Sequence, residues 1–263
     1  MRKIYLFTFM MLLLVHLKGQ AQQITLHVER AGTLHGMINA SRLPYITDLK
    51  LTGELNGTDI SFIRTLVKKN LRFLDLSEAR IVEGGAIYYS NYRTSNDIIG
   101  SYMFYNPDYS PISPCAISKI NLPNSVTGIE EGAFKSCTRL TDINIPNSVT
   151  SIGEQAFYNC DNLKSVYMNA STPPFIGSQA FHNISKDLTI YIPRGSYTAY
   201  WLSYWGNYNL VEYDPTDIQG VTTSAHNGVE KYFSIDGRPL PGPCKGVNII
   251  QDTDGKTRKA WIP

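Results

Sequence analysis

A pattern of hydrophobic and polar positions recurs along the middle of the chain about every 23 residues. The stretch 117–134 reads ISKINLPNSVTGIEEGAF, and the stretch 140–157 reads LTDINIPNSVTSIGEQAF. Each copy starts with alternating apolar residues, passes a proline and ends in an Ala-Phe pair. The alternation predicts a strand, and the proline after it ends the pairing. One copy cannot bury its own apolar residues, so we expect the copies to stack around a continuous core.

Equivalent positions of successive copies define columns in this stack. Ile120, Ile143 and Val166 share one inward strand column. The rings of the Ala-Phe pairs share another and are expected to form a stacked spine of Phe134, Phe157 and Phe181. Upstream, the segment 99–104 (IGSYMF) repeats the pattern of 176–181 (IGSQAF).

Two further strands are predicted at 46–51 and 71–76, which makes six strands in all. Between these two, Gly57-Thr58-Asp59 is expected to cap a short helix. That helix would bury four apolar residues: Phe62, Ile63, Leu66 and Val67.

The block 148–166, SVTSIGEQAFYNCDNLKSV, follows strand ends that read NLP and NIP. In these features the chain resembles the BspA-like family of bacterial leucine-rich repeats over roughly 98–213, and 46–76 resembles that family's divergent leading repeats. The resemblance implies a β-rich leucine-rich-repeat solenoid of about six parallel strands, with short helices and turns on its convex side. It also implies an exported protein that presents a surface for binding.

The first 21 residues have the pattern of a signal peptide. Arg2 and Lys3 precede an apolar run at 4–15, and Gly19-Gln20-Ala21 offers small residues for cleavage. The run is shorter than the roughly 20 residues of a transmembrane helix, so no transmembrane span is expected. We therefore expect export, to the periplasm, the cell surface or the medium.

The solenoid is expected to occupy 22–213, including an N-terminal cap. Its last part, 197–205, carries aromatic residues at helical spacing after Ser196, which we predict to be the N-cap. Two interpretations are open for Tyr197, Trp201 and Trp205: they close the last repeat, or they form a platform on which sugars stack.

An insertion at 82–114 breaks the period and is rich in Tyr, Ser, Asn, Gly and Pro. This mixture is typical of adaptable binding loops, because tyrosine supplies contact area at low entropic cost. Alternatively, the segment is a divergent repeat followed by an irregular loop. The candidate binding residues in it are Tyr88, Tyr89, Tyr92, Tyr105 and Tyr109.

Beyond the solenoid we predict a linker at 214–228 and a small β-meander at 229–263. The meander follows from strand patterns at 232–235 and 246–250, each followed by an Asp-Gly turn. It resembles the C-terminal sorting domains of exported Bacteroidetes-type proteins. A plain cap or a docking element for a partner is the other interpretation.

Composition and motifs argue against several functions. The net charge of +2 and the lack of a basic stripe argue against nucleic-acid binding. None of the common nucleotide, hydrolase or zinc-protease motifs occurs, and the histidines are scattered, so we expect no enzyme, cofactor or metal site. Asp252 and Asp254 precede a loop too short for an EF-hand.

The four cysteines are Cys115, Cys137, Cys160 and Cys244. Cys137 and Cys160 share a column in which the next repeat carries Ile184, which favours buried free thiols. A disulfide between adjacent repeats is the alternative.

Strand alternation also predicts which side chains point outward. They form a ladder of candidate binding residues: Asp48, Lys50, Phe73, Asp75, Lys119, Asn121, Asp142, Asn144, Ser165, Tyr167, Thr189 and Tyr191. The ladder is either a recognition surface or only the solvated face of the sheet, with stacked asparagine amides. The leading hypothesis is an adhesin-like protein that binds host extracellular proteins or glycans. The alternative is a structural or assembly component of the bacterial envelope that docks through its C-terminal meander.

Overall fold

The computed structural model describes residues 22–105, 107 and 115–214, together with four strands between 231 and 262. The chain divides into two compact units, Met1–Pro215 and Thr216–Pro263. The predicted signal peptide at 1–21, most of the predicted linker, Tyr109, Cys244 and the acidic pair Asp252 and Asp254 lie outside the described residues.

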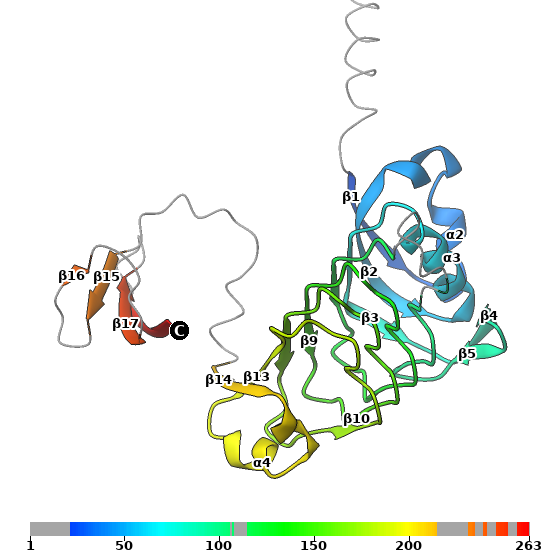
Figure 1. Ribbon diagram of the computed structural model, residues 1–263. Helices are drawn as coiled ribbons and strands as arrows, with labels where there is room; N and C mark the ends of the chain where they lie inside the picture. The colour runs from blue at the N-terminus through cyan, green and yellow to red at the C-terminus, as the bar shows by residue number, and fades with distance from the viewer. Residues whose placement is uncertain are drawn as a thin grey trace, which may run out of the picture. The chain divides into compact units, whose positions relative to one another are not determined.

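Eight parallel strands form the main sheet of the first unit, in the order β1-β2-β3-β7-β9-β11-β13-β14 (Figure 1). Their bounds are β1 Gln22–Val28, β2 Ile46–Leu55, β3 Phe73–Ile81, β7 Lys119–Asn121, β9 Asp142–Ile145, β11 Ser165–Met168, β13 Thr189–Pro193 and β14 Asn209–Tyr213. The solenoid is therefore confirmed, but the expected number of six strands was wrong. The two extra strands, β1 and β14, add to the two edges of the sheet and carry none of the landmarks that mark a repeat.

One inward column runs through the middle of the sheet. Its members are buried and pair strand to strand: Leu49, Leu74, Ile120, Ile143, Val166 and Ile190. After β7 and β9 the chain turns at a proline. The amides of Val126 and Val149 close these turns by donating to the carbonyls of Pro123 and Pro146. The continuous core thus arises as the repeat pattern predicts.

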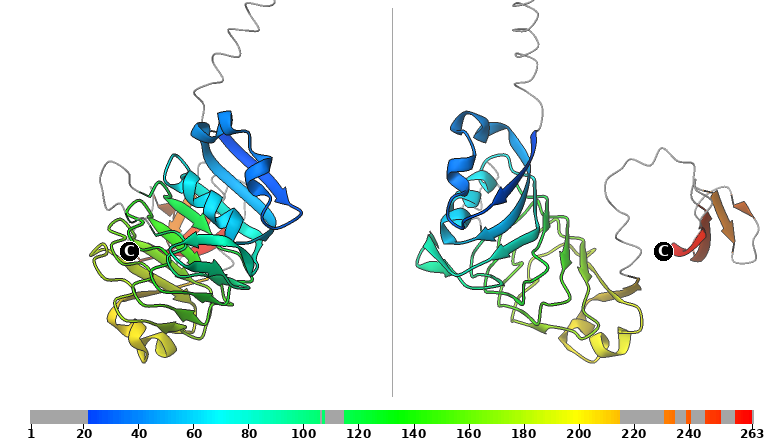
Figure 2. Two further views of the ribbon diagram at one scale, coloured as in Figure 1. Left: turned by 90° about the vertical axis from the view of Figure 1, so that its right-hand side faces the viewer. Right: turned by 180° about the vertical axis from the view of Figure 1, so that it is seen from behind.

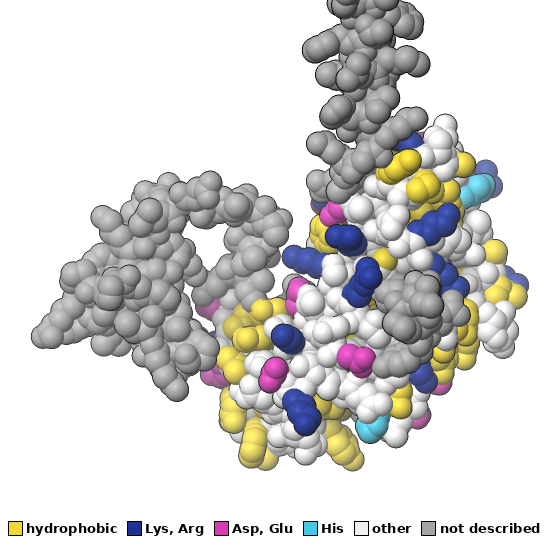
Figure 3. All heavy atoms as spheres, turned by 45° about the horizontal axis from the view of Figure 1, so that its top comes forward, with side chains coloured by type: hydrophobic (Ala, Val, Ile, Leu, Met, Phe, Trp, Pro, Cys, Tyr) yellow, Lys and Arg dark blue, Asp and Glu magenta, His cyan; other side chains and the backbone are white. Residues whose placement is uncertain are grey.

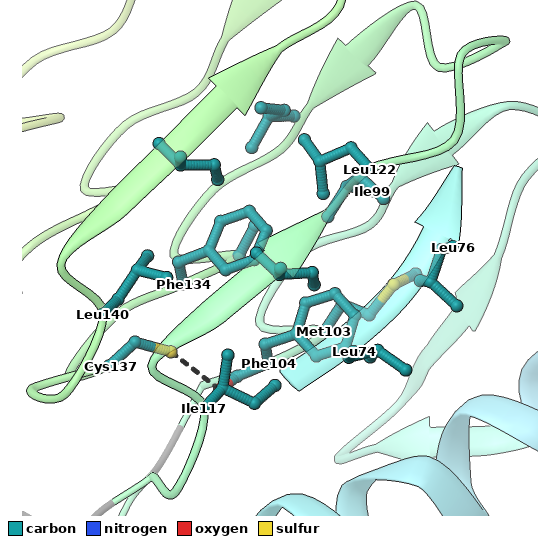
Figure 4. Packing of buried hydrophobic residues seen from close by; sticks show 14 of the residues in the cluster. Leu74, Leu76, Ile99, Met103, Phe104, Ile117, Leu122, Phe134, Cys137 and Leu140 are labelled. Atoms are coloured by element: carbon teal, nitrogen blue, oxygen red, sulfur yellow. Dashed lines mark hydrogen bonds between the residues drawn. The ribbon is translucent and has the colours of Figure 1, made fainter. Parts of the chain in front are cut away.

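The phenylalanine spine is confirmed and is one ring longer than predicted. Phe104, Phe134, Phe157 and Phe181 stack in sequence with centroid distances of 5.3, 5.1 and 4.9 Å. Figure 4 shows Phe104 and Phe134 among the buried residues of the core. Because Phe104 belongs to the spine, residues 99–104 (IGSYMF) within the predicted insertion form a repeat turn and not a loop.

A second sheet lies across the core from the main sheet. It has four parallel strands of two residues each, in the order β12-β10-β8-β6. Their bounds are β6 Ile98–Ile99, β8 Gly128–Ile129, β10 Ser151–Ile152 and β12 Phe175–Ile176. The sequence pattern predicted only turns here, because two residues are too few to show an alternation.

Backbone hydrogen bonds also join the Ala-Phe turns of successive repeats. The amide of Phe134 donates to the carbonyl of Ala156, and the amide of Phe157 donates to that of Ala180, both at 2.8 Å. The amides two residues before and two residues after each phenylalanine bond in the same direction. Each turn therefore offers three donors at alternate positions to the repeat that follows it.

Helices lie at the N-terminal end: α2 Leu34–Met37, the 3-10 helix η2 Ala40–Tyr45 and α3 Gly57–Val67. Asn56, not the predicted Gly57-Thr58-Asp59, is the N-cap of α3, and it forms a capping box with Asp59. Asp59 is buried and also accepts hydrogen bonds from the amides of Gly32 and Leu34. The helix buries Ile63, Leu66 and Val67 as predicted, whereas Phe62 is only partly buried.

The predicted insertion contains a hairpin of β4 Gly84–Tyr89 and β5 Tyr92–Thr94, which projects beside α3 (Figure 2). Arg64 of α3 holds the following turn, because its guanidinium donates to the carbonyls of Tyr102 and Met103, both at 2.7 Å. The same guanidinium lies 4.6 Å from the centre of the Tyr89 ring. Burial lowers the pKa of Arg64, and these acceptors compensate for the lost hydration.

The last repeat is followed by α4 Tyr197–Trp201 and the 3-10 helix η3 Tyr204–Asn207, not by one helix to residue 205. Ser196 precedes α4 but forms no side-chain cap, since its hydroxyl donates to the carbonyl of Pro193. Trp205 is fully buried against Phe181, with a centroid distance of 5.7 Å. Closure of the core is therefore the role of Trp205.

The described cysteines are free thiols in the core. Cys137 and Cys160 donate to the carbonyls of Phe104 and Phe134, one repeat earlier in each case. Figure 4 marks the first of these bonds. The alternative of a disulfide between adjacent repeats is wrong for Cys115, Cys137 and Cys160.

The second unit contains an antiparallel sheet in the order β16-β15-β17-β18. The strands are β15 Lys231–Ser234, β16 Pro239–Leu240, β17 Gly246–Gln251 and β18 Thr257–Ile262. β16 pairs with β15 at the edge away from β17, so the four strands do not follow chain order across the sheet.

Candidate binding surface

The twelve candidate residues of the ladder stand in two columns on the outer face of the main sheet. Strand registers align the first column as Asp48, Phe73, Lys119, Asp142, Ser165 and Thr189. They align the second as Lys50, Asp75, Asn121, Asn144, Tyr167 and Tyr191. All twelve are partly or fully exposed. The structure thus brings together side chains that lie up to 143 positions apart, from Asp48 to Tyr191.

The charged residues of this face lie on β2 to β9. Lys50 forms an ion pair with Glu78 at 2.5 Å, which raises the pKa of Lys50. The ammonium group of Lys119 lies 5.7 Å from the centre of the Phe73 ring. The hydroxyls of Thr47 and Thr141 donate to Asp48 and Asp142, the carboxylates that follow them in the sequence. Charges of both signs therefore alternate across the strands and are held by near neighbours.

The outward side chains of β11, β13 and β14 are uncharged, and three of them are tyrosines. The rings of Tyr167 and Tyr191 stack with a centroid distance of 4.6 Å and an interplanar angle of 14°. Tyr213 of β14 meets both rings edge-on, and its hydroxyl donates to Asn169 Oδ1 at 2.6 Å. Burial raises the pKa of Tyr213 to about 12 and also raises that of Tyr167. Ring contacts and a hydrogen bond thus fix these three tyrosines, the tyrosine cluster, in place.

The alternative of stacked asparagine amides finds no support in the geometry. Within the described part of the chain, the amides of Asn121 and Asn144 form no hydrogen bond with each other. Asn209 at the far edge does bridge strands, because its Nδ2 donates to Thr189 Oγ1 at 3.0 Å.

The tyrosines of the insertion lie in the structure differently from a free loop. Tyr88 is only 5% exposed and its hydroxyl donates to the carbonyl of Ser101 at 2.8 Å, so this candidate has almost no surface to offer. Tyr89, Tyr92 and Tyr105 each contact the ring of Tyr102 at centroid distances of 6.0, 5.4 and 5.4 Å. These rings mainly attach the hairpin to the repeat turn.

The aromatic residues of the C-terminal cap divide into two groups. Trp205 and Tyr200 are buried and donate hydrogen bonds to the carbonyls of Pro174 and Ala170, both at 2.8 Å. Trp205 is therefore not part of a sugar platform. Tyr197 and Trp201 remain exposed and stack on each other at 6.1 Å. The sequence pattern could not separate the two groups, because both follow the same helical spacing.

Exposed apolar residues beside this cap were missed by the sequence analysis. Leu202, Tyr204 and Phe175 are 80%, 74% and 66% exposed. In the space-filling view, hydrophobic side chains project at the lower end of the solenoid, where α4 lies, while charged side chains are scattered over the rest of this face (Figure 3). The one available signal was Phe175, which the repeat alignment places opposite Ser151 and Gly128.

No group of three or more His, Cys, Asp or Glu side chains among the described residues could hold a metal ion. Among the same residues, no helix has the length and apolar character needed to cross a membrane.

The repeats are similar to those of known proteins. Residues 98–216 match the model of the BspA type leucine-rich repeat region, in six copies. A leucine-rich repeat protein from Bacteroides ovatus, known from its crystal structure, is 20% identical with a TM-score of 0.36, over 72% of this chain and 42% of that one. The chain thus spans less than half of that protein, and no curated protein matches it. From β6 through β14, the solenoid is similar to the BspA type of leucine-rich repeats.

Proposed function

We propose that the chain is an exported, non-enzymatic binding protein. It contacts proteins or glycans, including those of a host, through the outer face of its main sheet. Proteins with BspA-type repeats are typically exported or located at the cell surface, which supports the prediction that the N-terminal 21 residues are a signal peptide. The observation that carries the proposal is the tyrosine cluster, whose stacked pair of rings remains partly exposed on the face of the sheet.

The physical reason lies in preorganisation. A tyrosine ring that is already stacked loses little conformational entropy when a ligand covers it. The ring presents an apolar face together with a hydroxyl, which suits both peptide and sugar surfaces. Asn144 pairs with Tyr167 in the strand register, and Ser165 precedes Tyr167 by two residues on the same face, so both can supply hydrogen bonds at the rim.

The test uses the full chain on immobilised extracellular-matrix proteins and on a glycan array. The matched variant is Tyr167→Asn with Tyr191→Asn, because asparagine already occupies this column at positions 121 and 144. We expect the double variant to fold and to lose binding by about tenfold or more. The control is Glu154→Gln, at an exposed turn residue outside the sheet face. Equal binding by the double variant and the control would contradict the proposed surface.

A second candidate function is a structural or assembly role in the bacterial envelope, in which the C-terminal strands dock onto a partner. It is favoured by the separate antiparallel sheet that Thr216–Pro263 contains. A chain that ends at Tyr213 distinguishes the two functions. Binding that survives this truncation supports the solenoid face, and binding that vanishes supports the C-terminal unit.

A further inference from the structure

The last repeat of the solenoid leaves unpaired the backbone donors that the repeats at Phe134 and Phe157 use. In the preceding turn, three amides donate to the next repeat: Gln155 to Ser178, Phe157 to Ala180 and Asn159 to His182, at 3.0, 2.8 and 3.0 Å. The equivalent donors of the last repeat are the amides of Gln179, Phe181 and Asn183. No described residue accepts a hydrogen bond from any of these three.

An acceptor is open at the same place. The carbonyls of Ile129 and Ile152 accept bonds from the amides of Gly153 and Gly177, both at 2.7 Å. The carbonyl of Ile176 is their counterpart in β12, and within the described chain it has no partner. Unpaired donors and acceptors along a strand edge are a template for pairing with another chain.

The cap closes this end only in part. The indole of Trp205 takes the place of the missing repeat at the carbonyl of Pro174. The rings of Trp205 and Tyr208 also cover the side chain of Phe181. Gln179 and Asn183, on either side of it, remain exposed. The cap therefore protects the core and leaves the outer edge of the last turn open.

Two shallow grooves flank the open edge. One of about 380 Å³ is lined by Ile176 and Gln179, and a neighbouring one has a volume of about 590 Å³. Phe175 and Tyr204 line both of them. Every residue that lines either groove is uncharged.

The rings of Phe175 and Tyr204 have no aromatic neighbour among the described residues, in contrast to the stacked rings of the spine. The strand register aligns Phe175 with Ser151, Gly128 and Ile98, so an aromatic ring occupies this column only in the last repeat. Exposed apolar groups that adjoin one another mark contact sites on monomeric proteins, and these two rings line the same two grooves.

We propose that the open end of the last repeat binds an uncharged peptide segment of a partner protein, which adds to the solenoid as a further turn. The donors are spaced at alternate positions, and in the inner repeats the same donors bond to peptide carbonyls, so a backbone of similar conformation fits them. The uncharged lining selects a peptide without charged side chains, since a charge there would lose hydration without a counter-charge. Phe175 and Tyr204 hold its apolar side chains. This site is separate from the sheet face of the proposed function.

The test probe is a blocked synthetic peptide with the sequence of residues 174–185, PFIGSQAFHNIS. Its carbonyls at Ser178, Ala180 and His182 are the ones that the donors of an inner turn recognise. The peptide is titrated into the full-length, isotope-labelled chain, and amide shifts are followed by NMR. We expect saturable shifts of the Gln179 and Asn183 amides, and no such shifts with a scrambled peptide or with maltoheptaose.

The variant that tests the grooves is Phe175→Ser with Tyr204→Ser, because serine is the natural residue at the aligned position 151. We expect it to weaken peptide binding by tenfold or more. Trp201→Ala, an exposed ring of the same cap that lines neither groove, is expected to leave binding unchanged. The proposal is overturned by unshifted Gln179 and Asn183 amides, by equal binding of the serine variant, or by shifts that maltoheptaose or the scrambled peptide also produces.

Discussion

The stacked phenylalanine spine allows a quantitative prediction at Phe157. This ring is fully buried between Phe134 and Phe181, at centroid distances of 5.1 and 4.9 Å and interplanar angles of 6° and 2°. A buried Phe→Ala substitution costs about 3–5 kcal/mol, depending on how far the site can collapse. Collapse is restricted here, because backbone bonds of 2.8 Å hold the turns on both sides at a fixed spacing. We therefore expect Phe157→Ala to lower the free energy of unfolding by about 4 kcal/mol.

The assay is urea-induced unfolding followed by circular dichroism, with the midpoint and the slope fitted separately. The control is Tyr204→Ala, which removes a ring of similar size that is 74% exposed and is expected to cost less than about 0.5 kcal/mol. Phe157→Leu keeps most of the volume and is expected to fall between the two. A cost below about 1.5 kcal/mol for Phe157→Ala would refute the argument, because it would mean that the repeats relax into the cavity.

Three further predictions follow from buried or paired groups. Arg64→Met leaves the carbonyls of the 102–105 turn without donors and is expected to cost about 2–4 kcal/mol in urea unfolding, with Arg64→Lys in between. The bond from Arg80 holds the pKa of Asp97 below its usual value near 3.8, so its stabilisation is present above that pH and is lost as the pH falls through the folded pKa. The difference in melting temperature between the natural chain and Asp97→Asn should accordingly shrink as the pH falls below 4; a constant difference would count against this pair. Burial raises the pKa of the Cys160 thiol, so Ellman's reagent should modify Cys160 only in urea; labelling of the native chain at the unfolded rate would contradict its burial.

The repeats could be predicted from the sequence because their pattern is strong and local. Three features indicate the same repeat boundaries: the prolines at 123 and 146, the Ala-Phe pairs and the strand alternation. Together they predicted the inward columns correctly. The outward ladder followed from the same alternation, since side chains of a strand must point to opposite faces. The sequence therefore predicted which residues are neighbours across the strands, but it did not predict a ligand.

The ends could not be predicted, because there the determinants are tertiary. β1 and β14 have no repeat landmarks and are strands only because the sheet offers them an edge. The N-cap of α3 is Asn56 instead of the predicted residues 57–59. The buried Asp59 accepts hydrogen bonds from the amides of Gly32 and Leu34, which are distant in the sequence. The division of the cap aromatics into buried and exposed rings likewise depends on where the last repeat ends.

The sheet face and the open end of the solenoid differ in what determines them. In a solenoid each repeat contacts only its neighbours, so stability spreads along the stack while surface chemistry stays local. Each repeat can change its outward residues without altering the core. One face can therefore carry charges near Asp48 and a tyrosine cluster near Tyr191. The open edge at Gln179 differs, because it exists only where the stacking stops. A leucine-rich-repeat stack thus offers a side face set by the sequence of each repeat and an end face set by its last turn alone.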